Sequence, residues 1–363
     1  MTIKTVDVLP LALPLVPGAS RSTFAGKVVD VARMNLVRVE TTDGVVGWGE
    51  AFSHAAWQPA AVALREVVAP LAVGRDESGI AALSLDLQRA LHLFGRSGAV
   101  LYALSGLEIA LWDIAGKRAG RSIASLLGGA RRSLLPAYAS LPRYGDPAEV
   151  ARNAAAAAAR GYGSIKLHEI GEQQVAAARA AVGPEVALMM DTNCPWTVEE
   201  ALAIADRVRP QRLLWLEEPV WPPEDAAGLA RVRAGAGIAI AAGENAASPE
   251  ECIAMMDAGA VDYIQPSVTK IGGIGAWMRV AGEAAARGVA VMPHSPYFGA
   301  GLLATLHMAA ALPGDCLVEH MYRDLAANPF AAALQPRGGS FVLPDGPGLG
   351  CEPDPEVMRR HAA

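Results

Sequence analysis

Apolar and polar positions alternate along the first fifty residues, and the spacing then becomes helical. The alternating segments cover 3–9, 28–40 and 45–50. Strands with one buried face show this period of two. Asp43 and Gly44 stand between the last two segments and predict a hairpin turn. From 58 to 127 the apolar residues recur at helical spacing, so the first third of the chain is expected to form an α+β domain.

The pattern changes at Pro136, after which short apolar runs alternate with alanine-rich helical stretches. Asp146, Thr197 and Ser248 each precede such a stretch and predict helix N-caps. The eight runs cover 137–140, 164–167, 188–191, 213–216, 238–242, 263–266, 289–293 and 316–319. Eight such repeats predict a parallel α/β barrel, and an open doubly wound sheet is the alternative.

The chain is expected to divide into three parts. A capping domain would cover residues 1–127, the barrel residues 128–325, and a C-terminal segment residues 326–363. The segment from 330 onward is rich in Gly and Pro. Such composition predicts irregular chain, which we expect to pack back on the capping domain.

Composition and charge narrow the class of protein. A chain of 363 residues can bury a large core, and its net charge of -6 gives no electrostatic footprint for nucleic acid. The four cysteines lie far apart without the spacing of metal ligands, which indicates free thiols in a reducing compartment. Asp7, Pro10 and Pro14 interrupt the apolar stretch near the N-terminus, and no run approaches roughly 18 apolar residues. We expect a cytoplasmic protein that binds neither nucleic acid nor membrane.

Three acidic residues, Asp191, Glu217 and Glu244, each end an apolar run, at intervals of 26 and 27 residues. One strand-helix repeat of a parallel barrel takes roughly 25 to 30 residues, and the strand ends converge on one face. Three carboxylates placed there would repel one another unless a cation lay between them. An all-oxygen ligand set suits Mg²⁺ or Mn²⁺. The spacing therefore predicts a divalent metal site.

Basic residues end two of the other runs. Lys166 and His168 are two positions apart, so both side chains would face the same side of a strand, and His294 ends the seventh run. Neighbouring positive charge would lower the pKa of Lys166 and His168 toward neutral pH, as a general base requires. Surface ion pairs and a structural histidine are the alternatives. Glu319, which ends the eighth run, would bind a substrate oxygen or form a buried ion pair with an arginine.

Taken in order, these residues resemble the enolase superfamily, on the side of mandelate racemase and muconate lactonizing enzyme. The resemblance covers nearly the whole chain and rests on Gly47–Glu50, Ser105–Lys117, Leu127–Gly129, Asp191 with Asn193, Glu217–Pro219, Gly243–Glu244, Lys270–Gly273 and Pro347–Gly350. It implies a modified (β/α)7β barrel with an N-terminal α+β capping domain. It also implies an enzyme, assembled as a homo-oligomer, that binds one Mg²⁺ through Asp191, Glu217 and Glu244. Such an enzyme abstracts the proton next to a substrate carboxylate.

The resemblance also suggests roles for the basic residues. His168 occupies the position where family members often carry the second lysine of a Lys-x-Lys pair. Lys166 or His168 would be one acid/base and His294 the other. Family racemases carry an aspartate, and the lactonizing and epimerizing branch a lysine, where this chain has Ser267. His294 therefore lacks its usual carboxylate partner, which argues against racemization through a histidine-aspartate dyad.

The combination of Lys166 with His168, Ser267, and the segments 191–196, 221–225 and 293–299, the last of which contains His294, is similar to the cycloisomerases of sugar-acid lactones and anhydro sugar acids. A small sugar acid or its lactone would be the substrate, and its ring would open after α-proton abstraction through an enediolate. Dehydration to a 2-keto-3-deoxy acid is the main alternative, followed by racemization or epimerization, and by non-catalytic binding of a sugar acid. Loops of the capping domain would set selectivity. The expected substrate contacts are Arg21, His54, Trp57, Asn193, Lys270, Tyr297 and Glu319.

Overall fold

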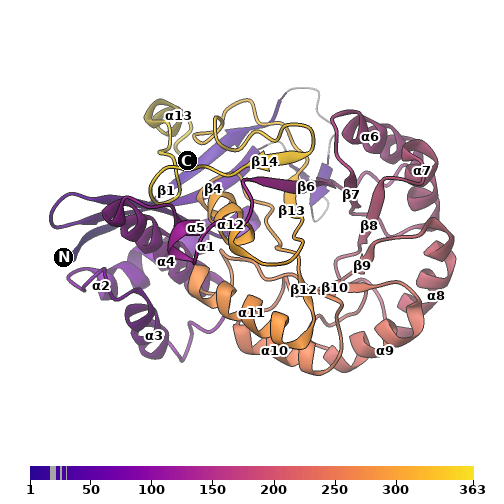
Figure 1. The fold of residues 1–363 in the computed structure, drawn as a ribbon, viewed down its shortest axis with the longest axis horizontal. Coiled ribbons are helices and arrows are strands. Elements are labelled where there is room, and N and C mark those ends of the chain that lie inside the picture. Colours follow the sequence, from indigo (N-terminus) through magenta and orange to yellow (C-terminus); the bar gives the residue numbers. More distant parts are fainter. Residues whose placement is uncertain (17–21, 25–26, 30) are drawn as a thin grey trace.

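A small antiparallel sheet and its helices lie against a larger parallel barrel (Figure 1). The computed structural model describes residues 1–16, 22–24, 27–29 and 31–363. The small sheet has the order β1-β4-β5, and a separate hairpin pairs β2 with β3. These strands are β1 (Ile3–Pro14), β2 (Ser22–Phe24), β3 (Lys27–Val29), β4 (Val31–Thr41) and β5 (Val46–Ala51). The predicted hairpin between β4 and β5 is confirmed.

The strand β1 is longer than the sequence pattern indicated. It continues through Pro10 to Pro14 and pairs with β4 along its whole length. Proline cannot donate a hydrogen bond to a neighbouring strand, but an edge strand leaves one side of its backbone free of the sheet. Because β1 is at the edge of this sheet, it tolerates both prolines.

Helices cover one side of the small sheet, and α4 packs directly on β5. A Cβ at Gly47 would lie 2.2 Å from the carbonyl oxygen of Ala110, and one at Gly49 would lie 2.0 Å from that of Gly106. Only glycine permits this close approach. The helical segments are η1 (His54–Ala56), α1 (Trp57–Ala63), η2 (Leu64–Val68), α2 (Ala69–Ala72), α3 (Ile80–Ala90), α4 (Gly98–Ala119) and α5 (Ile123–Leu126).

Contrary to the expectation that no segment approaches membrane-spanning length, α4 is long and apolar enough by composition alone. Its residues from Leu101 to Ile114 are almost all buried between the sheet and the barrel. The helix therefore belongs to the core of the molecule.

Eight parallel strands form the barrel in the order β12-β11-β10-β9-β8-β7-β6-β13, and seven of them are followed by a helix. The strands are β6 (Leu134–Leu141), β7 (Ser164–Leu167), β8 (Ala187–Asp191), β9 (Trp215–Glu217), β10 (Ile240–Ala242), β11 (Tyr263–Ile264), β12 (Ala290–Val291) and β13 (Val318–Met321). The helices are α6 (Pro147–Ala159), α7 (Glu172–Val182), α8 (Val198–Val208), η3 (Arg209–Gln211), α9 (Ala226–Ala236), α10 (Pro249–Asp257), α11 (Ile274–Arg287) and α12 (Ala300–Ala311). The predicted (β/α)7β barrel with an α+β capping region is confirmed.

The predicted helix starts are confirmed by their side-chain hydrogen bonds. Asp146 and Ser248 each accept a hydrogen bond from a backbone N–H in the first turn of α6 and α10. Thr197 forms a reciprocal capping box with Glu200 at the start of α8. These caps satisfy backbone donors that have no partner within the helix, and so fix where each helix begins.

The barrel interior is layered. Tyr138 on β6 contacts Trp215 on β9, with ring centroids 5.8 Å apart, although these strands are not neighbours in the sheet. The two side chains therefore meet across the interior. Residues two positions apart on a strand face the same side, so Trp215 and Glu217 on β9 both point into the interior. Trp215 Nε1 donates a hydrogen bond of 2.8 Å to Glu217. An apolar layer thus lies directly beneath the carboxylates at the strand ends.

The C-terminal tail is more ordered than predicted. It contains β14 (Ser340–Val342), which pairs antiparallel with β6, and α13 (Pro355–Arg360). The prediction of irregular chain was wrong here because short strands and helices surrounded by Gly and Pro leave little periodic signal. The backbone N–H of Ala12 on β1 donates to the carbonyl of His361 in the tail. The division of the chain at 127 and 325 stays a prediction.

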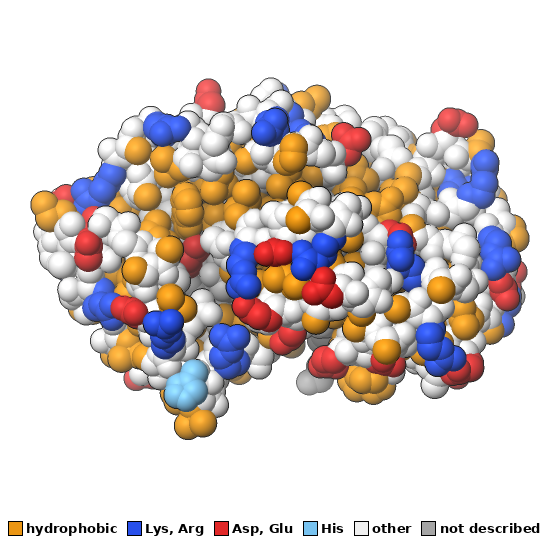
Figure 2. All heavy atoms as spheres, turned by 60° about the horizontal axis from the view of Figure 1, so that its bottom comes forward, with side chains coloured by type: hydrophobic (Ala, Val, Ile, Leu, Met, Phe, Trp, Pro, Cys, Tyr) orange, Lys and Arg blue, Asp and Glu red, His pale blue; other side chains and the backbone are white. Residues whose placement is uncertain are grey.

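Charged side chains of both signs alternate over the outer face in Figure 2. Ion pairs join successive barrel helices, such as Arg231 with Glu199 at 2.9 Å and Arg279 with Glu250 at 2.6 Å. Exposed pairs of this kind contribute only about 0–1 kcal/mol each. On this face neither sign of charge gathers into a continuous patch.

Candidate active site

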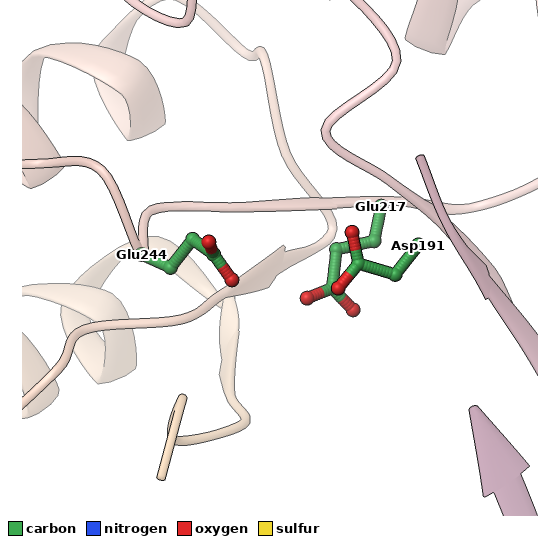
Figure 3. Close-up of side chains that lie close together, drawn as sticks. All are labelled: Asp191, Glu217 and Glu244. Atoms are coloured by element: carbon green, nitrogen blue, oxygen red, sulfur yellow. The ribbon is translucent and has the colours of Figure 1, made fainter. Parts of the chain in front are cut away.

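Three carboxylates converge at the C-terminal ends of neighbouring barrel strands. Asp191 ends β8, Glu217 ends β9, and Glu244 follows β10 by two residues. One oxygen from each lies within 4.8 Å of the others. Asp191 and Glu217 are side by side, and Glu244 points toward them from across a shared space (Figure 3). The predicted convergence of these residues is thereby observed.

Backbone and side-chain contacts hold the carboxylates in register. The Thr192 hydroxyl lies 3.0 Å and 2.9 Å from the carbonyl oxygens of Glu217 and Glu218, which ties the end of β8 to the end of β9. Asn193 has a φ of 55°, a left-handed conformation that asparagine tolerates better than most residues. Its side-chain amide donates to Asp191 Oδ1 at 2.9 Å. Asn193 therefore orients a carboxylate of the cluster.

Lys166 is fully buried among carboxylates. Its Nζ lies 2.8 Å from Glu217, 3.0 Å from Asp191 and 3.0 Å from Glu319. Burial alone would lower the pKa of this amine, but the three carboxylates outweigh burial and raise its pKa well above the ordinary value. The expected lowering of the Lys166 pKa is therefore absent, because the sequence argument considered neighbouring cations and not the three acids around it. A divalent cation among the same acids would oppose this effect.

His168 lies at one end of the carboxylate cluster. Its Nε2 is 3.1 Å from Asp191 Oδ2, and its Nδ1 is 2.6 Å from the carbonyl oxygen of Leu141. A carbonyl can only accept, so Nδ1 carries the proton and a neutral ring presents the Nε2 lone pair to the site. Burial lowers the pKa of His168, but Asp191 more than compensates and the net shift is upward.

His294 lies at the other end of the cluster. Its Nε2 is 3.1 Å from Glu244 Oε2, and its Nδ1 is 3.1 Å from the hydroxyl of Ser267. Burial lowers the pKa of this imidazole well below its usual value, and the cationic Lys270 and Lys166 add to that effect although Glu319 opposes it. The two histidines thus face the carboxylate cluster from its two ends.

The electrostatics of the cluster fit a divalent cation. Burial, followed by the charge of Asp191, raises the pKa of Glu217, and burial raises that of Glu244 well above its usual range. Among the described residues, no donor is aligned for a hydrogen bond to Asp191 Oδ2, although Lys166 Nζ lies 3.0 Å and His168 Nε2 3.1 Å away. Lys166 and His168 lower the pKa of Asp191 in spite of its burial. Glu217 and Glu244, however, resist ionization and would gain from a neighbouring cation, and oxygen ligands suit a hard ion. The residues present therefore could hold such an ion.

Glu319 and Lys270 complete the rim. Besides Lys166, Glu319 accepts hydrogen bonds from the Ser140 hydroxyl at 2.7 Å and from the backbone N–H of Ser295 at 2.9 Å. Its ionic partner in the structure is a lysine, where the sequence argument had considered an arginine. Lys270 donates to the backbone carbonyl of Glu244, and its Nζ lies 5.2 Å from the centre of the Phe52 ring. Phe52 thus brings the capping region to the barrel mouth.

The expected substrate contacts from the capping region lie in different surroundings. The His54 ring is exposed and stacks on Phe52 at 5.1 Å. The guanidinium of Arg33 lies over the Trp57 ring at 4.8 Å. Arg21, another of these expected contacts, lies outside the described residues. The roles of these side chains in substrate binding stay predictions.

Sequence reasoning missed Glu218 and the hydrogen-bond partner of Tyr297. Glu218 is buried behind the carboxylate cluster, where its oxygens accept hydrogen bonds from the side-chain amide of Asn245 at 2.8 Å and 3.0 Å. The Tyr297 hydroxyl points at Ser267 and away from open space. Glu218 directly follows Glu217, and Tyr297 lies three residues after His294. The Glu217–Pro219 motif was the sequence signal that included Glu218.

A (β/α)7β barrel with an acidic cluster at its mouth that could hold a cation, and basic side chains on either side, defines a class of barrel enzymes. Residues 149–357 match the enolase C-terminal domain-like family, and residues 14–128 match the mandelate racemase / muconate lactonizing enzyme N-terminal domain. The chain belongs to the enolase superfamily, in the mandelate racemase and muconate lactonizing enzyme family. The predicted family and enzymatic character are confirmed.

Relatives of this chain act on sugar acids according to their names. It is 37% identical over 336 residues to D-galactarolactone cycloisomerase of Agrobacterium fabrum, covering 87% of this chain and 88% of the relative. It is 32% identical over 324 residues to arabinonate dehydratase of Saccharolobus solfataricus, covering 86% of each. The structure of 3,6-anhydro-D-galactonate cycloisomerase from Zobellia galactanivorans matches with a TM-score of 0.87 at 25% identity and covers 100% of both chains.

Proposed function

We propose that this protein is a Mg²⁺-dependent cycloisomerase that opens the ring of a sugar-acid lactone or an anhydro sugar acid. One observation carries the proposal. Two imidazoles, His168 and His294, face the carboxylate cluster from its two ends, each with Nε2 at 3.1 Å from a carboxylate oxygen. Removal of a proton on one side of a bound acid and delivery on the other require this arrangement.

The chemical difficulty is the weak acidity of a proton next to a carboxylate. When bound by Asp191, Glu217 and Glu244, Mg²⁺ would hold the substrate carboxylate and compensate the negative charge that develops on it. The protein adds the fixed positive charge of Lys166, which its three carboxylate neighbours hold in place. Preorganized charge of this kind lowers the barrier without a reorganization step. Mn²⁺ would serve the same oxygen ligands.

His168 is the residue that we assign as the base. Its Nδ1–H is fixed by the Leu141 carbonyl, so its Nε2 can accept the α-proton. The amine of Lys166 is engaged by three carboxylates and is fully buried, which leaves it as a positioned cation. His294, at the opposite end, would act as the acid once its Nε2 is protonated, and would return to the neutral ring on giving up that proton.

The reaction would conserve all atoms of the substrate. The α C–H bond breaks and its proton goes to His168. The bond between the β-carbon and the ring oxygen then breaks and the oxygen leaves with the electron pair, as a carboxylate from a lactone or, from an anhydro acid, as an alkoxide that takes up a proton, and an enol forms. The β-carbon is protonated on the face of His294 while the enol hydroxyl gives up its proton, which gives an open-chain 2-keto-3-deoxy acid that is an isomer of the substrate, with no water lost.

Dehydration is the second candidate, because relatives of comparable coverage are named as sugar-acid dehydratases. The first step would be identical, and a free β-hydroxyl would leave as water. The leaving group belongs to the substrate, so the residues described above serve both reactions.

Proton NMR of the enzyme with Mg²⁺ against hexaric and hexonic acids, their lactones and their anhydro forms separates the two. We expect turnover of ring forms to isomeric 2-keto-3-deoxy acids, and loss of turnover on chelation or in His294→Asn. His92→Asn is the matched control, because His92 is exposed and its ring bonds to the carbonyl of Arg89 at the end of its own helix. Turnover of open-chain acids alone would assign dehydration, and inertness toward every sugar acid would contradict the proposal.

A further inference from the structure

Ser267, Tyr297 and His294 form a closed ring of hydrogen bonds beside the carboxylate cluster. His294 Nδ1 lies 3.1 Å from the Ser267 hydroxyl, which is itself bonded to the Tyr297 hydroxyl. The Tyr297 hydroxyl in turn donates to the backbone carbonyl of His294 at 3.2 Å. All three side chains are buried. The ring therefore begins and ends at the same histidine.

The direction of the three hydrogen bonds follows from the His294 carbonyl, because it is the one group of the ring that can only accept. The His294 carbonyl takes the Tyr297 proton, so the tyrosine oxygen is left to accept the proton of Ser267. With its proton used, the Ser267 oxygen can only accept, and His294 Nδ1 must donate to it. The reverse direction would satisfy two hydrogen bonds instead of three and would leave a buried carbonyl without this donor.

We propose that Ser267 and Tyr297 are positioning residues that hold His294 in the tautomer protonated at Nδ1, with Nε2 directed at the reacting substrate. The hydroxyls of Ser267 and Tyr297 thus fix the proton on Nδ1 of His294, as the Leu141 carbonyl fixes the proton on Nδ1 of His168. Both histidines present the same nitrogen to the carboxylate cluster. The buried tyrosine hydroxyl has this role in place of the substrate contact expected from the sequence.

The inference rests on the proposed function for the catalytic use of His294, but its tautomer can be measured without a substrate. The chain has seven histidines. With ¹⁵N-labelled histidine and saturating Mg²⁺, the two ring nitrogens of His294 are assigned from the signals lost in His294→Asn. We expect Nδ1 to be the protonated nitrogen when the ring is neutral.

Variants then test each bond of the ring. In Tyr297→Phe the Ser267 proton is released and can be donated to Nδ1, so the Nε2-protonated tautomer should appear, and Ser267→Ala should give a mixture. Ser267→Asp restores an acceptor and should keep Nδ1 protonated. On the substrate found for the enzyme, the first two should lower kcat by about 10- to 100-fold with little change in KM, and Ser267→Asp should recover much of that loss.

Thr305→Val is the matched control. The Thr305 hydroxyl is buried on α12 and donates to the carbonyl of Gly301, one turn earlier in the same helix, so its removal should change neither tautomer nor kcat. Thermal unfolding checks that each variant folds, and Ser267→Ala carries the test if Tyr297→Phe does not. An Nε2-protonated ring in the wild-type enzyme, or an unchanged tautomer in both Tyr297→Phe and Ser267→Ala, would overturn the inference. A protonated Nδ1 without any sugar-acid turnover would support it while the proposed function fails.

Discussion

At the scale of single residues, Lys166 is the charge on which the carboxylate cluster depends. It contacts Asp191, Glu217 and Glu319 within 3.0 Å and is inaccessible to water. Removing one partner of a buried ionic group leaves the others without compensation. The cluster is therefore a balance between acids that could hold a metal ion and one amine that offsets their negative charge.

We predict that Lys166→Met lowers the free energy of unfolding by about 3–5 kcal/mol in the presence of a chelator, because three buried carboxylates lose their cation. Saturating Mg²⁺ should recover a large part of this loss by compensating the same charges. Urea unfolding with and without Mg²⁺ measures both values. Lys117→Met is the control, because Lys117 pairs with Asp113 at 2.9 Å elsewhere in the protein and its loss should not depend on Mg²⁺. Equal deficits of Lys166→Met in both conditions would contradict the account.

We predict that Asp191→Asn weakens Mg²⁺ binding at least about tenfold, because it removes a charged ligand from an all-oxygen site. Calorimetric titration measures the affinity. Glu218→Gln is a suitable comparison, since Glu218 is also buried but bonds to Asn245 and lies outside the carboxylate cluster. If both substitutions changed the affinity equally, the assignment of the ligands would be wrong.

At the scale of elements, Glu50 joins β5 of the capping region to the start of α12 in the barrel. It accepts a hydrogen bond from the backbone N–H of Gly301 at 2.8 Å. Burial raises the pKa of this carboxyl to about 7, although the backbone donors of Gly301 and Gly299 oppose the shift. In the unfolded chain the same group would ionize near its ordinary value of 4.5. Above that pH the unfolded state releases a proton that the folded state keeps.

We therefore predict that the Glu50 contribution to stability is fully present below about pH 4.5 and is lost as the pH rises to about 7. A difference of this size corresponds to about 3 kcal/mol. The check is the free energy of unfolding from pH 4 to 8 for the wild-type protein and Glu50→Gln. Comparing the two proteins cancels the titration of other groups. The difference between their free energies of unfolding should therefore change across this window. A constant difference across the range would show that Glu50 ionizes alike in both states.

The elements themselves were largely predictable. Each of the eight barrel strands lies where an apolar run was found, because a buried strand needs such a run. Their bounds were not predictable, and β11 and β12 have only two residues each. Where such a strand stops depends on pairing with its neighbours, which are distant in sequence. The continuation of β1 through Pro10 and Pro14 has the same origin, since only its place at the sheet edge permits it.

At the scale of the whole molecule, the barrel mouth unites residues that lie far apart along the chain. The regular spacing of Asp191, Glu217 and Glu244 made their convergence predictable, because successive strand ends of a barrel meet on one face. The contacts behind them were not predictable. Ser267 and Tyr297 lie in two separate loops, and the hydrophobic pattern of a sequence does not show which loop side chains contact each other. The charge state of Lys166 likewise required knowledge of all three of its acidic neighbours.

We assign removal of the α-proton to His168 and place protonation of the β-carbon at the opposite end of the carboxylate cluster. Following turnover in D₂O with Mg²⁺ by proton NMR tests this assignment most directly, in the wild-type enzyme and in His168→Asn. We predict one deuterium at the β-carbon of the wild-type product, and loss of both turnover and α-proton exchange in His168→Asn with Mg²⁺ affinity retained. Undiminished α-proton exchange in His168→Asn, or a product without deuterium, would contradict the account.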